Sequence, residues 1–188
     1  MITQALQAVA EDLNRHLGSS RSSVSRVVLG PVANDKLQAA TVNDGKLVMT
    51  LINIQQFKTG MSDAAVTSRT GTTLTRLKRP IDLNLSVMFS ASFEHYTSAL
   101  STLSKTIQFM HNKPFFEHSN TKNFPKTVKQ LNFNLMNLGL DEQSHLWSSL
   151  GASYMPSVVY MVRMLSLPGD TIDKVKAVDS ITHEVLPK

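Results

Sequence analysis

The stretch PIDLNLSVMFS, residues 80–90, carries the clearest strand pattern in the chain. After Pro80, two sets of residues alternate without a break over ten positions. One set is apolar throughout and consists of Ile81, Leu83, Leu85, Val87 and Phe89. A period of two is typical of a β-strand that packs one face against a core. The sequence therefore predicts a strand that begins at Pro80.

Two further strands and a helix are predicted on the N-terminal side of this stretch. Residues 46–54 (KLVMTLINI) are apolar on both faces, which predicts a strand in the interior of a sheet. Residues 24–29 predict a shorter strand. Residues 2–17 predict an amphipathic helix with Gly18 as its C-terminal cap, because the apolar residues form one stripe. This stripe consists of Ile2, Leu6, Val9, Leu13 and Leu17.

A second long helix is predicted directly after the 80–90 strand. Ser92 is expected to cap it, with Glu94 in the first turn, where a negative charge is favourable. Pro114 ends it, because proline cannot continue a helix. The expected apolar stripe consists of Tyr96, Leu100, Leu103, Ile107 and Met110.

The C-terminal third predicts two strands around a short helix. Residues 115–129 have no regular pattern, and residues 131–135 alternate as a strand does. Asp141 is expected to cap a helix that Gly151 ends. Residues 157–167 are mostly apolar and predict a final strand.

The order of these elements defines the expected fold class. Helix, strand, strand, loop, strand, helix, strand, helix and strand predict an α/β (α+β) fold with a mixed sheet and flanking helices. The length of 188 residues fits a single domain. We expect this domain to span residues 1–167. Residues 168–188 are weakly patterned and are expected to form a C-terminal tail, either mobile or added to a sheet edge.

Residues 56–79 are the main candidate for a functional segment. They are rich in Thr, Ser and Gly, and they hold five basic residues against the single acidic Asp63. A segment of this length is expected to leave the domain as a long loop or an extended hairpin. The basic residues are Lys58, Arg69, Arg76, Lys78 and Arg79.

This basic segment has three possible roles. It can dock on an acidic protein surface, which we favour, or it can be a solvated loop without a partner. Binding of nucleic acid is less favoured, because Phe57 is the one aromatic residue nearby and a stacking platform is missing. The sequence predicts a partner-docking segment, with a nucleic-acid-binding module as the alternative.

The sequence offers little for catalysis. The chain has no cysteine, which excludes disulfides, thiolate metal sites and cysteine nucleophiles. None of the six histidines has the spacing of a metal motif, and the glycine-rich phosphate loops and the nucleophile elbow are absent. The sequence predicts no catalytic residue, metal or cofactor, and therefore no enzyme. A hydrolase built from distant residues is the least favoured alternative.

Two other features limit the possible roles. No run of 18 apolar residues is present, so a membrane span is not expected. Trp147 is the single tryptophan and lies at helical spacing from Leu150. It is expected to anchor either the core or an interface with another protein.

The stretch LWSSLGASYMPSVVYMVRMLSL, residues 146–167, resembles a known family. That family is the N-terminal domain of the cap, or tube-terminator, proteins of extracellular contractile injection systems such as the antifeeding prophage. Four other stretches agree in the same order: residues 1–18, 27–34, 47–56 and 82–116. The chain departs from the family at Gln55 and Gln56, where acidic residues are expected. Larger members also carry a further C-terminal region.

The resemblance implies a fold like that of phage tail terminators and a structural role. Such subunits form a homohexameric ring on the last layer of the inner tube. The implied partners are further copies of the chain, the inner tube protein and the sheath protein, without a membrane. Assembly is expected in the cytoplasm, in a particle that can be released from the cell.

Overall fold

The computed structural model describes residues 1–18, 26–33, 45–57, 66–70, 73–77, 81–166 and 171–176. A six-stranded sheet has the strand order β1-β2-β5-β8-β7-β6, and a three-stranded sheet has the order β3-β4-β9. The elements are α1 (Ile2–Leu17), β1 (Val27–Leu29), β2 (Lys46–Gln56), β3 (Val66–Thr70), β4 (Thr73–Leu77), β5 (Leu83–Ser92), α2 (Tyr96–Asn112), β6 (Phe115–Glu117), β7 (Val128–Leu135), α3 (Leu140–Leu150), β8 (Ser157–Ser166) and β9 (Thr171–Lys176). The predicted mixed sheet with flanking helices is confirmed.

The large sheet is mixed because of one strand. Strand β1 pairs with β2 in parallel, and the other neighbouring strands of this sheet are antiparallel. Strand β2 lies between β1 and β5, as its apolar pattern predicts. Strand β5 begins at Leu83, three residues after Pro80, and continues to Ser92. It lies at the centre of the sheet between β2 and β8.

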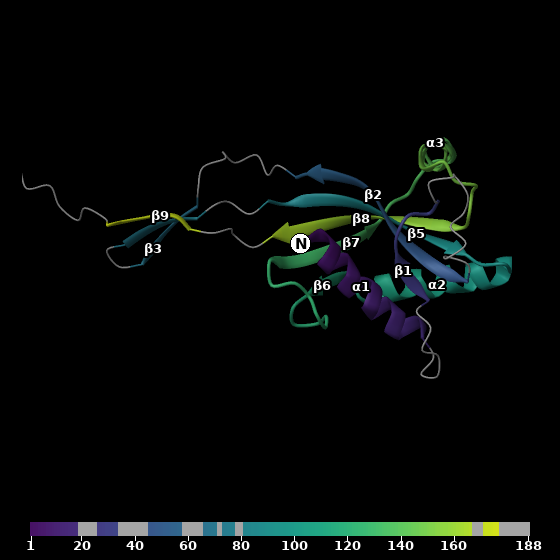
Figure 1. Ribbon diagram of the computed structural model, residues 1–188, viewed down its shortest axis with the longest axis horizontal. Helices are drawn as coiled ribbons and strands as arrows, with labels where there is room; N and C mark the ends of the chain where they lie inside the picture. Colours follow the sequence, from purple (N-terminus) through teal and green to yellow (C-terminus); the bar gives the residue numbers. More distant parts are fainter. Residues whose placement is uncertain are drawn as a thin grey trace, which may run out of the picture.

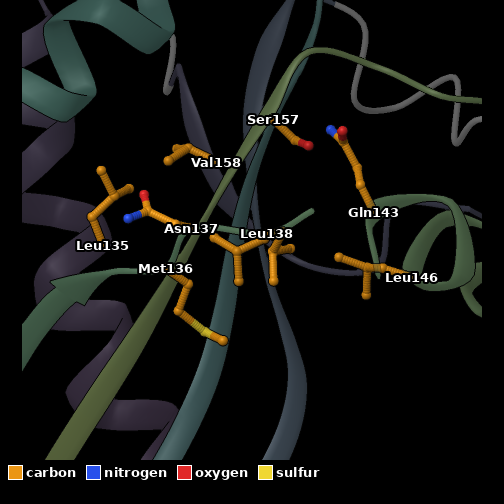
Figure 2. A pocket seen from close by; sticks show the side chains of 9 residues that line it. Leu135, Met136, Asn137, Leu138, Gln143, Leu146, Ser157 and Val158 are labelled. Atoms are coloured by element: carbon orange, nitrogen blue, oxygen red, sulfur yellow. The ribbon is translucent and has the colours of Figure 1, made fainter. Parts of the chain in front are cut away.

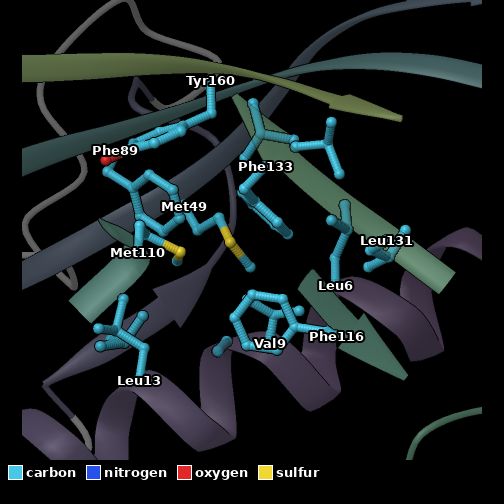
Figure 3. Close-up of a cluster of buried hydrophobic side chains, with 14 of the residues drawn as sticks. Leu6, Val9, Leu13, Met49, Phe89, Met110, Phe116, Leu131, Phe133 and Tyr160 are labelled. Atoms are coloured by element: carbon cyan, nitrogen blue, oxygen red, sulfur yellow. The ribbon is translucent and has the colours of Figure 1, made fainter. Parts of the chain in front are cut away.

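Helices α1 and α2 cover one face of this sheet, and α3 lies on the opposite face (Figure 1). The main core lies beneath α1 and α2, where Leu6, Val9 and Leu13 of α1 meet side chains of the sheet (Figure 3). Part of β5 is therefore buried on both faces. Phe89 lies in the main core, whereas Met88 lies in a smaller cluster beneath α3.

Aromatic rings connect the strands of the main core. The ring of Phe89 meets that of Tyr160 edge-on at 5.7 Å, and Tyr160 lies 6.1 Å from Phe133. Phe133 in turn contacts Phe116 at 5.2 Å, so the chain of rings runs from β5 to the edge strand β6 (Figure 3). Burial raises the pKa of the Tyr160 hydroxyl, because the charged phenolate would be poorly solvated among these rings.

The predicted helix at residues 2–17 is confirmed as α1. Gly18 caps it, but with an extended backbone (φ −75°, ψ 106°) rather than a left-handed one. Its N–H donates to the carbonyl of Asn14, and a Cβ at Gly18 would lie 2.9 Å from that oxygen. Asp12 anchors the helix to the rest of the domain through an ion pair with Lys113 (2.5 Å).

The predicted start of α2 is wrong. Ser92 remains in the sheet, where it pairs with Lys46, and the helix begins only at Tyr96 with His95 at the cap position. Glu94 therefore lies before the helix rather than in its first turn. The pairing between β2 and β5 extends two residues past the alternating stretch, so the helix begins later in the sequence than predicted. The predicted end, at Asn112 before Pro114, is confirmed.

The predicted apolar stripe of α2 is also partly wrong. Leu103 and Met110 are buried, but three members are exposed: Tyr96 (64%), Leu100 (44%) and Ile107 (39%). The helix instead turns Ala99, Thr106 and Phe109 toward the core. Small side chains let a helix approach a sheet closely. The Thr106 hydroxyl is satisfied there because it donates to the Thr102 carbonyl at 2.8 Å.

Two smaller differences concern the C-terminal half. The stretch 115–129, expected to be irregular, begins with the short strand β6. Helix α3 starts at Leu140 with Gly139 as its cap, and Asp141 lies in the first turn. The Glu142 carboxylate accepts a hydrogen bond from the Gly139 N–H at 2.9 Å, which serves this helix end in place of Asp141. Gly151 ends α3 in the left-handed conformation (φ 62°), as predicted.

Candidate functional site

The three-stranded sheet, which we call the arm, lies apart from the large sheet at the other end of the molecule (Figure 1). Strands β3 and β4 come from the basic segment 56–79 and pair as an antiparallel hairpin. Strand β9, from the region expected as a tail, pairs with β4. The arm thus joins two parts of the chain about a hundred residues apart, which the sequence patterns did not reveal.

The structure describes two of the five predicted docking residues. Arg69 lies in β3 opposite Leu74, and Arg76 lies in β4 between Thr67 and Asp173. The other three members of the set, Lys58, Lys78 and Arg79, lie outside the described residues. Strand β9 adds two lysines to the arm, Lys174 and Lys176, which the sequence analysis did not assign to a docking site.

Residues on either side of the β3–β4 hairpin are bonded to each other at the large sheet. The Phe57 N–H donates to the Asp82 carbonyl at 2.9 Å, so the chain leaves β2 and enters β5 at neighbouring positions. The arm itself has short strands of five or six residues. A small isolated sheet generally needs an apolar face or packing against another element to be stable in water.

Trp147 lies beneath α3 and is only 5% exposed. It packs with Val32, Met88 and Val159 in the smaller cluster, and its ring meets that of Tyr154 edge-on at 5.6 Å. Its indole N–H has no hydrogen-bond partner in the described part of the chain. Trp147 therefore contributes packing to the domain, and its polar atom contributes no bond.

Helix α3 is flanked by two open pockets. One, of about 310 Å³, lies between α3 and the ends of β7 and β8, with Leu146 and Gln143 facing Leu138 and Ser157 (Figure 2). The other, of about 340 Å³, is bordered by Leu140, Trp147, Tyr154 and four smaller or polar residues. Leu140 is 85% exposed and Tyr154 64% exposed, so two large exposed side chains stand beside the polar residues of the second pocket.

Substitution of Trp147 distinguishes its packing from its polar group. We expect Trp147→Ala to lower the free energy of unfolding by about 3–5 kcal/mol, because it leaves a cavity beneath α3. Trp147→Phe keeps much of the ring volume and removes an unpartnered donor, so the loss should stay within about 1.5 kcal/mol. Urea denaturation of both variants measures the difference. Equal losses would contradict this account of the N–H, and an unchanged stability of Trp147→Ala would favour an interface role instead.

The described residues offer no evident chemistry. They contain no group of three His, Asp or Glu side chains that could hold a metal ion. Five histidines, at positions 16, 95, 111, 118 and 145, are exposed, and His183 lies outside the described part. Neither pocket beside α3 is lined by a carboxylate, a histidine or a basic residue. None of the described helices is long and apolar enough to span a membrane.

Comparison with known proteins identifies the family. A family model described as the Pvc16 N-terminal domain matches residues 3–180. No curated protein matches the chain. A solved structure of the sheath/tube terminator of an extracellular contractile injection system, PVC, in the extended state is similar, with a TM-score of 0.63 and 16% identity. The cap of the anti-feeding prophage, a tube-terminating cap, has a TM-score of 0.56 and 16% identity.

Both similarities extend over the whole chain. They cover 100% of this chain and 64% and 61% of the two solved chains, so the present chain spans less than two thirds of either. The resemblance expected from residues 146–167 and the four other stretches is confirmed. The match of residues 3–180 shows that this chain belongs to the family of the Pvc16 N-terminal domain.

Proposed function

We propose that this chain is a structural terminator subunit that ends the inner tube of a contractile injection system. The carrying observation is the family match over residues 3–180. The fold shared with a sheath/tube terminator and with a tube-terminating cap supports the same role. The role is structural rather than enzymatic, in keeping with two pockets beside α3 that no carboxylate, histidine or basic residue lines.

The subunits form a homohexameric ring on the last layer of the tube. A ring requires one surface of each copy to contact a different surface of the next, and the rotation has to close. The ring lies on the inner tube protein and contacts the end of the sheath. Assembly takes place in the cytoplasm, and the finished particle can be released.

The arm reaches from this ring to the tube or sheath. Its distance from the large sheet and its basic residues, including Arg69 and Arg76, support this assignment. Charge guides encounter and register, whereas buried apolar contacts supply most of the binding free energy. The outer strands β3 and β9 each pair on one side within the arm, so each has an edge that can receive a partner.

Electron cryomicroscopy of particle ends tests the proposal. We expect six copies of the chain as a ring on the last tube layer, with each arm in contact with tube or sheath. Particles from cells that lack the chain should have tubes of variable length. A terminal layer without this chain, or unchanged tube lengths in its absence, would overturn the proposal.

Nucleic-acid binding by the arm is the alternative function. The lysines of β9 add to the basic character of the arm and favour it. Against it, the ring of Phe57 is covered by Arg163 and offers no open stacking platform. Binding to DNA that weakens steeply with added salt would support this alternative.

A further inference from the structure

Helix α3 covers only part of its face of the large sheet (Figure 1). The uncovered part of that face is lined mainly by amide side chains. Across the neighbouring strands β2, β5, β8 and β7, one row of paired residues is Gln55, Asn84, Arg163 and Asn132. The next row is Asn53, Ser86, Met161 and Asn134. We call these two rows the amide face. Arg163 is its single charged residue.

The Arg163 side chain is held in place by an aromatic ring. Its guanidinium carbon lies 3.8 Å from the centre of the ring of Phe57, the residue that directly follows β2. Such stacking fixes the plane of the guanidinium and leaves its edges free for hydrogen bonds. The position of the charge is therefore set by the fold before any partner arrives.

This guanidinium has no acceptor within the described part of the chain. Its Nε atom is buried and makes no hydrogen bond. Asp82, which lies just before β5, forms no ion pair with Arg163, whereas Asp12 pairs with Arg15 and Lys113. A buried donor without an acceptor is costly to keep, and a carboxylate that binds the guanidinium would offset part of that cost.

The flanking residues suit a carboxylate. Asn84 and Asn132 are the paired neighbours of Arg163 on either side, and both are half-buried. A guanidinium with carboxamide donors on both sides can bind the two oxygens of one carboxylate. We propose that the amide face binds an acidic side chain of a partner protein, with Arg163 at the centre of the site.

A protein carboxylate fits this face better than a nucleic acid. The two rows contain one cation and no second Lys or Arg, whereas nucleic-acid sites neutralise several phosphates. The aromatic ring at the site is already stacked beneath the guanidinium. The inference concerns the partner's chemistry alone, and it stands whether or not a ring of these subunits caps a tube.

Nuclear magnetic resonance of the arginine Nε–H groups tests the inference in the full chain. Because the Arg163 Nε is shielded from water, its proton exchanges slowly and its signal is observable. We expect a capped Gly-Glu-Gly peptide to shift this signal in a saturable way. A capped Gly-Gln-Gly peptide, which differs by one charge, should bind about tenfold more weakly or not at all.

Two aspartate substitutions provide matched variants. Asn132→Asp places a carboxylate beside Arg163. This carboxylate occupies the site in place of the peptide, so the peptide-dependent shift should disappear. Asn134→Asp adds the same charge one row away, opposite Met161, and should keep the peptide affinity within about threefold of wild type. Folding of each variant is checked by the rest of the spectrum.

Three results would overturn the inference. One is an Arg163 signal that stays still while those of other arginines shift, which indicates unspecific attraction. Another is Asn132→Asp and Asn134→Asp weakening the peptide equally. The third is a shift caused by inorganic phosphate or an oligonucleotide but not by the glutamate peptide, which would assign the site to a phosphate.

Discussion

Replacing residues 58–81 with Asn-Gly, and ending the chain at Ser166, is expected to abolish control of tube length while leaving the large sheet folded. Strands β2 and β5 are antiparallel neighbours, and Phe57 already bonds to Asp82. A two-residue Asn-Gly turn suits such a junction. The truncation removes β9, which would otherwise lose its partner β4.

The loss of function should be close to complete, because the arm is the proposed contact with tube or sheath. The free energy of unfolding of the remaining domain should rise by up to about 2 kcal/mol, because a short turn replaces a long connection. Tube lengths are measured by electron microscopy of particles carrying the variant, and stability by urea denaturation. A folded variant that still yields tubes of normal length would disprove the role of the arm.

A milder variant separates the charge of the arm from its shape. The double substitution of Arg69 and Arg76 by Gln removes two charges while the hairpin remains. We expect this variant to cap tubes more slowly, with a salt dependence weaker than that of the wild type. An effect as large as that of the deletion would mean that the charges, rather than the sheet, hold the partner.

The sequence predicted the central strands well because their signal is local. The alternation around Leu85 and Val87 and the apolar run of β2 each follow from burial of a strand in a sheet. The stripe of α2 failed where periodicity alone had to decide orientation. Two stripes fit this helix, and the sheet selected the one with the small residues Ala99 and Thr106.

Features that depend on distant pairing could not be predicted. Strand β9 pairs with β4 across about a hundred residues, and neither segment carries a pattern that identifies the other. The Arg163 site has the same origin. In the sequence, Arg163 is merely a lone charge in an apolar strand, and its contact with Phe57 appears only when β2, β5 and β8 are aligned in register.

Phe89→Ala should cause the largest loss of stability among single substitutions in the main core. Phe89 is fully buried in the central strand, and its ring contacts Tyr160. Removing a buried phenylalanine ring leaves a cavity and costs about 3–5 kcal/mol, a large part of a typical domain stability of about 5–15 kcal/mol. Urea denaturation measures the loss. The control is Phe115→Ala, a residue 44% exposed on the edge strand, which should cost less than about 1.5 kcal/mol.

The chain of rings makes a further test of this core possible. Phe89 and Phe133 both contact Tyr160, so the cavities left by their removal share a neighbour. We expect Phe89→Ala and Phe133→Ala together to deviate from additivity by at least about 0.5 kcal/mol. Met88 is next to Phe89 in sequence but packs beneath α3, on the other face. Phe133→Ala and Met88→Ala should therefore add within about 0.5 kcal/mol, and coupling between those two would contradict the division of the core into two clusters.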